Sequence, residues 1–208
     1  MEFLQHPKQI YIGKINTSET EIKDLIKAWI AISIAFAIVM RGLLELNFYE
    51  RFIIASVTVG TGFLLHELGH KIIAQRYGCF AEFRSFDQML ILAVIMSFFG
   101  FVFAAPGAVM ISGPVGVRRN GKISAAGPIV NLVLALAFLS ILLIPPTGLI
   151  KVIAFYGFFI NSWLALFNMI PVWNFDGVKV LRWDKTIYII IVAIALAFMF
   201  LQNFISIT

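Results

Sequence analysis

The chain has 208 residues, of which 61% are hydrophobic and only 13% are charged. A soluble domain of this size needs more polar surface, so the composition indicates a membrane protein with several spans and a lipid bilayer as its partner. The formal net charge of +5 does not change this interpretation, because the basic residues flank apolar runs, where they favour lipid headgroups. We therefore expect no nucleic-acid partner.

The amino-terminal segment, residues 1–24, is polar and has no short apolar run that ends in a small-residue cleavage site. This pattern predicts no cleaved signal peptide. Towards its end, Ser18 and Glu21 have the spacing of a capping box, which is typical of the start of a helix. A single cysteine, Cys79, excludes a disulfide within the chain and leaves no cysteine-based zinc site.

Five apolar runs are each about twenty residues long, the length that crosses the hydrocarbon core as a helix. They are Leu25–Leu46, Phe52–Ile73, Ile123–Ile144, Leu149–Ile170 and Thr186–Ile205. A sixth apolar stretch, Met89–Ile111, contains glycines and a proline that interrupt a simple span, so we expect a re-entrant or strand-like element there. The expected fold is an all-α polytopic membrane protein, with a single integral-membrane domain over residues 1–208.

The second run contains the sequence His66-Glu67-Leu68-Gly69-His70. Histidines four residues apart lie on the same face of a helix, so both imidazoles can reach one zinc ion. Glu67 can then accept a proton from a metal-bound water, whose pKa zinc lowers towards about 7. Ionisable residues inside a membrane-spanning helix cost free energy and are therefore functional by default. A chance match to the zinc-binding pattern is thus disfavoured. Gly69 allows another helix to approach closely.

A catalytic zinc ion needs a third protein ligand and one open position for water. The third histidine, His6, lies in the polar amino-terminal segment, where we expect a solvated side chain. Among the carboxylates, Asp176 is the best candidate, because it follows a break in the fourth run at Pro171. Broken backbone near membrane depth persists only where protein or a polar cavity surrounds it. A loop aspartate at the membrane interface is the alternative interpretation.

Taken together, three motifs resemble those of the site-2 protease family of intramembrane zinc metalloproteases. They are, in order, the HExxH helix at His66–His70, the Ala-Gly-Pro helix start within Gly121–Asn131, and the Asn-x-x-Pro…Asp-Gly segment within Asn168–Gly177. The resemblance covers residues 52–182, which we expect to form the catalytic core. It implies a short form of the family, without a PDZ or CBS domain.

The resemblance implies one Zn²⁺ per chain, held by His66, His70 and Asp176, with Glu67 as the general base. The implied activity is that of a zinc metalloendopeptidase that hydrolyses peptide bonds within or near the transmembrane helices of membrane-protein substrates, in regulated proteolysis. Two alternatives stay open: a membrane-helix-binding pseudo-protease without activity, and an ion or proton transporter. The intact set of four site residues favours the protease.

Three asparagines are further site candidates. The resemblance implies that Asn131 and Asn168 lie near the substrate or the site. Where the family commonly has proline and then leucine or methionine before Asp-Gly, this chain has Asn174-Phe175, so Asn174 is a candidate for an extra hydrogen bond to ligand or substrate.

The segment Gly100–Gly121 is rich in glycine and other helix breakers. Such a composition, together with the resemblance, suggests an irregular or strand-like edge beside the site. An unwound substrate that added to this edge would gain backbone hydrogen bonds and present its carbonyl to zinc. An ordinary membrane-surface loop is the alternative.

The distribution of basic residues predicts the orientation in the membrane. With the amino terminus in the cytoplasm, five crossings and a returning Met89–Ile111 element place most of the 16 lysines and arginines inside. We therefore expect the active site to face the cytoplasmic side and the carboxyl terminus to lie outside.

Overall fold

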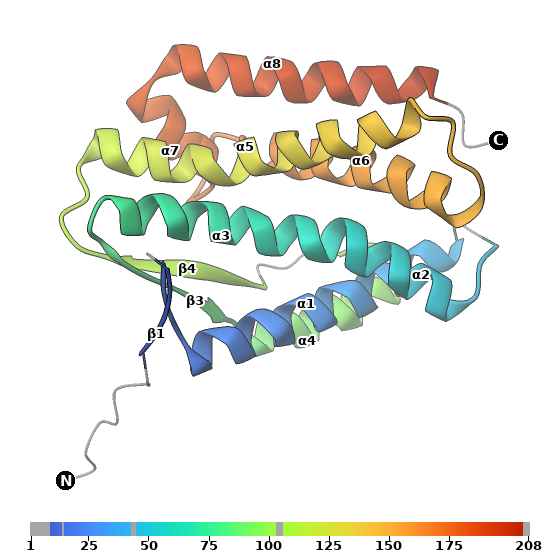
Figure 1. The fold of residues 1–208 in the computed structure, drawn as a ribbon, viewed down its shortest axis with the longest axis horizontal. Helices are drawn as coiled ribbons and strands as arrows, with labels where there is room; N and C mark the ends of the chain where they lie inside the picture. Colours follow the sequence, from blue (N-terminus) through green and yellow to red (C-terminus); the bar gives the residue numbers. More distant parts are fainter. Residues whose placement is uncertain (1–8, 14, 43–44, 103–105, 206–208) are drawn as a thin grey trace, which may run out of the picture.

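The computed structural model describes residues 9–13, 15–42, 45–102 and 106–205 and is a bundle of helices with two short β-hairpins (Figure 1). Within this part of the chain, four helices are long and apolar enough to cross a membrane. They are Phe48–Arg76, Val117–Leu142, Gly148–Asn168 and Lys185–Phe204. Each coincides with a predicted span to within a few residues, which confirms the all-α polytopic membrane fold.

The helix α1 (Glu19–Val39) covers the larger part of the first predicted span, Leu25–Leu46. It has 21 residues, but five charged side chains in its first half keep it out of the group of four apolar helices. These are Glu19, Glu21, Lys23, Asp24 and Lys27. The fifth crossing therefore stays a prediction.

The start of α1 is capped as the sequence predicts, but only in part. Ser18 accepts a hydrogen bond from the Glu21 backbone N–H at 3.2 Å. The Glu21 carboxylate does not complete a capping box, because it is bonded to Thr17, Lys71 and Phe83 instead.

The first of the four apolar helices is continuous but not uniform. It consists of α2 (Phe48–Ala55), a π-helical turn (Ser56–Gly60) and α3 (Thr61–Arg76). The Ser56 carbonyl accepts hydrogen bonds from the Trp29 indole at 3.1 Å and from the Thr61 hydroxyl at 2.9 Å. The π-helical turn therefore packs on α1, shortly before the HExxH sequence.

The predicted re-entrant or strand-like element consists of a short helix, α4 (Asp87–Ser97), and a strand, β4 (Gly107–Ser112). The strand pairs antiparallel with β3 (Phe80–Ser85), and Phe83 lies opposite Val109. The strand-like element is thus confirmed.

A second hairpin, which the sequence does not predict, lies in the polar amino-terminal segment. It is formed by β1 (Gln9–Ile12) and β2 (Ile15–Ser18). The backbone of Asn16 exchanges two hydrogen bonds with the Gln75 side chain, at 3.0 and 2.7 Å, which attaches this hairpin to the end of α3.

The HExxH helix α3 occupies the middle of the molecule (Figure 1). On one side it contacts α5 (Val117–Leu142), and on the other it contacts the β3–β4 hairpin and α1. The helix α6 (Gly148–Asn168) packs on α5, and α8 (Lys185–Leu201) packs on α6. A Cβ atom on Gly69 would lie 3.2 Å from the Ala126 carbonyl oxygen, so this glycine permits the close approach of α5 that the sequence predicts.

Candidate metal centre

Three side chains from two helices converge at the centre of the bundle. His66 and His70 come from α3, and Asp176 is the first residue of α7 (Asp176–Trp183). The Nε2 atoms of the two histidines lie 3.0 Å apart, and the Asp176 Oδ2 atom lies 3.3 Å from one and 3.1 Å from the other. All three residues are buried. The sequence candidates for the ligand set are therefore brought together.

This cluster fits a zinc ion by its donor types and by its dimensions. Two imidazoles and one carboxylate are a donor set of catalytic zinc sites. In a tetrahedron with zinc–ligand distances of about 2.0–2.1 Å, neighbouring ligand atoms lie about 3.3 Å apart, close to the separations observed here. Gly127 keeps the space beside the cluster open, because a Cβ atom there would lie 2.5 Å from Nε2 of both His66 and His70.

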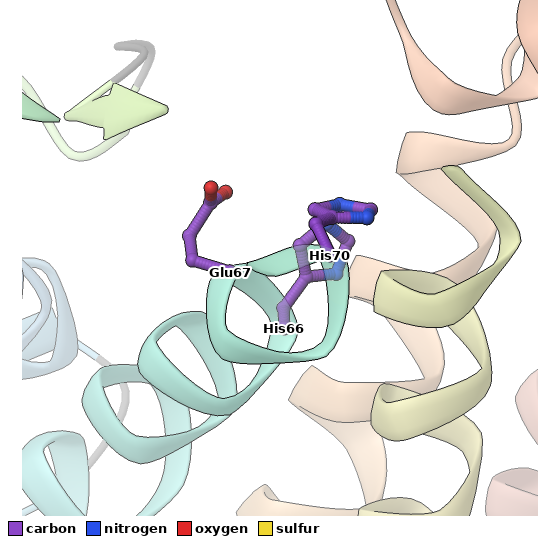
Figure 2. A group of neighbouring side chains, drawn as sticks. All are labelled: His66, Glu67 and His70. Carbon is purple, nitrogen blue, oxygen red and sulfur yellow. The ribbon is translucent and has the colours of Figure 1, made fainter. Parts of the chain in front are cut away.

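Glu67 leaves α3 in a different direction from the two imidazoles (Figure 2). One carboxylate oxygen lies within 4.8 Å of the histidine ligand atoms, which is a looser group than the one with Asp176. Its Oε2 atom accepts a hydrogen bond from the Val109 N–H of β4 at 3.1 Å. Glu67 is thus held beside the cluster by the hairpin, at a distance that suits a proton acceptor better than a third ligand.

The outer nitrogen of each imidazole has a protein partner. His66 Nδ1 lies 2.6 Å from Asn131 Oδ1, and His70 Nδ1 lies 2.8 Å from the Ile123 carbonyl oxygen. Both partners are acceptors, so each Nδ1 carries the proton and donates. Each Nε2 therefore presents its lone pair to the shared centre, which is the arrangement that metal-binding histidines use.

Asn131 belongs to a longer chain of buried amides. Its Nδ2 atom donates to the Gly62 carbonyl oxygen at 3.2 Å and to Asn161 Oδ1 at 3.0 Å, and Asn161 donates in turn to the Gly157 carbonyl oxygen. Asn131 and Asn161 are both fully buried. Asn161 was not among the candidates predicted from the sequence, although an asparagine in the middle of an apolar helix is a signal that could have identified it.

The break after α6 delivers Asp176 to the cluster. Tyr188 on α8 donates its hydroxyl to the Met169 carbonyl oxygen at 3.0 Å, which fixes the end of α6. Trp173 adopts φ 49°, the left-handed region that is strained for a bulky side chain. Gly177 lies so close to the Met169 backbone that a Cβ atom would clash there. Packing therefore requires a glycine directly after Asp176.

The ionisation state of Asp176 suits a metal ligand. Burial raises the pKa of the carboxyl, but His70 and His66 lower it by more when they are protonated, so the pKa then lies below its ordinary value. With the Nε2 lone pairs free, a bound zinc ion would supply the positive charge that favours the carboxylate instead.

The other sequence candidates lie in different places. Asn168 donates to the Leu164 carbonyl oxygen one turn earlier in α6, at 2.9 Å. Asn174 is exposed in the turn that precedes Asp176. Their contact with a substrate stays a prediction, and His6 lies outside the described residues.

The fold and the site define a helical membrane protein with a buried two-histidine, one-carboxylate cluster and an adjacent glutamate. A protein of Methanocaldococcus jannaschii named "Putative zinc metalloprotease" is 42% identical over 177 residues, which cover 84% of this chain and 90% of the relative. The chain belongs to the same family as this relative. No protein-family model matches the chain, and no solved structure matches it.

Proposed function

We propose that the chain is a zinc metalloprotease, and more specifically an intramembrane endopeptidase that resembles the site-2 proteases. Its substrates are membrane proteins that are cut within or near their transmembrane helices. The observation that carries the proposal is the convergence of His66, His70 and Asp176 within 3.3 Å, with both histidines on a helix that is apolar enough to cross a membrane. The name of the relative supports the coarser assignment, a zinc metalloprotease.

In the proposed mechanism, His66, His70 and Asp176 hold one Zn²⁺ ion. When bound, zinc supplies a Lewis acid that polarises the scissile carbonyl and lowers the pKa of a water molecule. Glu67 accepts the proton of the attacking water and passes it to the leaving amine. Asn131 and the Ile123 carbonyl oxygen hold the two imidazoles in the orientation that this task requires.

Substrate binding is proposed at the outer edge of β4, at the outward positions on either side of Val109, whose own N–H is held by Glu67. In the β3–β4 ladder, Phe83 and Val109 direct their N–H groups away from each other, towards Glu21 and Glu67. The outer edge of β4 therefore faces the candidate general base. A substrate segment that unwinds and pairs with this edge would bring its backbone next to Glu67.

We further propose that the active site faces the cytoplasm, with the amino terminus on the same side. This orientation follows from the positive-inside rule. Single cysteines placed at Asn120 and Thr208 in a Cys79→Ser background test it with a membrane-impermeant thiol reagent. Labelling of the first from outside, or of the second from the cytoplasm, contradicts the orientation.

The decisive experiment compares wild type with Glu67→Gln, each purified and reconstituted with a model transmembrane-helix substrate. Wild type should bind one zinc per chain and cleave the substrate. Glu67→Gln should keep the zinc and lose cleavage, because the ligands stay while the proton acceptor is removed. Glu45→Gln, a change at an exposed carboxylate, is the matched control and should cleave normally. Zinc-loaded wild type that cleaves no membrane substrate would support the non-catalytic binder instead.

A further inference from the structure

A buried ion pair lies directly beside the HExxH sequence and has no part in the proposed chemistry. Lys71 follows His70 in α3 and is 1% exposed, and its partner Glu21 in the first turn of α1 is fully buried. A buried ion pair is stable only where hydrogen bonds satisfy the remaining oxygen positions. Here the Glu21 Oε2 atom also accepts the Thr17 hydroxyl at 2.7 Å, and its Oε1 atom accepts the Phe83 N–H at 3.0 Å.

The Phe83 contact links this pair to the candidate general base. Phe83 of β3 lies opposite Val109 of β4, and the two N–H groups point outwards, as in the non-hydrogen-bonded pairs of an antiparallel ladder. One N–H is bound by Glu21 and the other by Glu67. At this single register position, the hairpin is therefore held between two carboxylates from two different helices.

The hairpin depends on such anchors because it is small. The sheet that contains β3 and β4 has two strands, and a two-stranded hairpin is marginally stable by itself. Its main apolar anchor is the same residue, since Phe83 is fully buried and meets the Phe63 ring edge to face at 5.8 Å. Both the side chain and the backbone of Phe83 are thus fixed against α1 and α3.

We propose that Glu21 and Lys71 are positioning residues, which fix the β3–β4 hairpin against α3 so that the Val109 N–H orients the Glu67 carboxylate. Glu21 of the ion pair fixes β3 through the Phe83 N–H, and the pairing of the two strands fixes β4 relative to β3. The Val109 N–H of β4 then holds the Glu67 carboxylate. This inference rests on the proposed role of Glu67, but its structural part is measurable without any activity.

Two double variants test the proposal, and both remove the two buried charges together. Glu21→Gln/Lys71→Met keeps an amide oxygen that can accept the Phe83 N–H, whereas Glu21→Leu/Lys71→Met has no acceptor. The readouts are hydrogen exchange of peptides over residues 80–85 and 107–112, zinc content and kcat. The control is Glu19→Gln/Lys23→Met, which removes an exposed ion pair of the same helix.

We expect the leucine variant to exchange at least tenfold faster in both hairpin peptides, with kcat about tenfold lower and zinc content unchanged. The glutamine variant should lie closer to wild type in exchange and in kcat, and the control should equal wild type. A positioning role predicts the change in residues 107–112, which a purely local contact at Phe83 would leave unaffected.

Three results would overturn the proposal. One is unchanged exchange in 107–112 for the leucine variant. Another is an equal rise in exchange over α5 together with loss of zinc, which would mean that the pair stabilises the whole bundle. The third is altered hairpin exchange with wild-type kcat in an active enzyme. If wild type itself does not cleave, the proposed function fails, while the exchange data still decide whether the pair positions the hairpin.

Discussion

Two carboxylates, Glu21 and Glu67, make the same contact on opposite edges of the β3–β4 hairpin and differ in what balances their charge. Each accepts one outward N–H, from Phe83 and Val109 respectively. Glu21 is paired with Lys71. In the described part of the chain, no lysine or arginine lies within ion-pair distance of Glu67.

This difference in charge partner suggests that Glu21 has a structural role and Glu67 a reactive one. A buried carboxylate with a lysine partner and satisfied hydrogen bonds is locked in one state. A buried carboxylate without a cation is costly, unless a positive charge arrives nearby. The Glu67 carboxylate lies within 4.8 Å of the ligand atoms of His66 and His70, so a zinc ion bound there is the charge that would balance it. The same contact therefore serves the fold at Glu21 and, in our proposal, the chemistry at Glu67.

The strongest way to break this comparison is the single change Lys71→Met. It leaves Glu21 buried without its cation, so we expect the free energy of unfolding to fall by about 3–5 kcal/mol. Glu67→Gln should lower it far less, because no ion pair is lost. Denaturation midpoints of the two variants measure the difference. Lys23→Met, in an exposed pair, is the control, and equal midpoints for all three would contradict the comparison.

Removal of Asp176, the proposed third ligand, should have the next largest effect. Asp176→Asn is expected to weaken zinc binding by more than about 100-fold, or about 3 kcal/mol, because the ionised ligand is lost. Zinc content after dialysis against a chelator measures this, with His6→Ala as the control. Equal loss in both variants, or loss only in the histidine variant, would show that Asp176 is not the third ligand.

The amide chain behind His66 offers a smaller test on the metal side. Asn161→Leu removes the acceptor for Asn131 without touching a ligand. Because partners of ligating histidines typically contribute tenfold to hundredfold in affinity, we expect zinc binding to weaken by about that factor. Competition with a chromogenic chelator gives the affinity. Ser140→Ala, which removes an exposed hydroxyl bonded within α5, should bind zinc like wild type.

The smallest effect is expected for Val109→Pro, which removes the N–H that Glu67 accepts and replaces the partly buried valine side chain. Proline is tolerated on a strand edge where its N–H would point away from the ladder. We expect kcat to fall about tenfold with zinc content unchanged, the loss that one charge-assisted hydrogen bond accounts for. Val109→Ala, which shortens the side chain but keeps the N–H, is the control. Identical kcat in both variants would mean that the Val109 N–H does not orient Glu67 for catalysis.

Much of this molecule could be predicted from its sequence, because the relevant signals are local. Apolar runs of about twenty residues identify spans, and the His66–His70 spacing places two candidate ligands on one helix face. Asp176 was found because a helix break marks it. The amino-terminal hairpin was not predicted, since its strands have only four residues each and no clear alternation of apolar and polar residues.

The remaining features depend on partners that are far apart in the chain. Glu21 and Lys71 are separated by 50 positions, and Asn131 and Asn161 by 30, so no spacing rule connects them. The interpretation of the basic residues as lipid-headgroup contacts is wrong for Lys71, which is buried. Only the packing of α1, α3 and the hairpin shows that its charge is balanced inside the protein.

The π-helical turn at Ser56–Gly60 determines how α2 is rotated about the helix axis relative to α3. Each residue of an α-helix turns the chain by about 100°, so the length of this turn sets which way α2 faces relative to the histidines on α3. Ile54 is buried against α1 and α6, while His66 and His70 face α5. A deletion of one residue from this turn would act as a rotation of about 100° between these two faces, and Ile54 would then point away from its present neighbours.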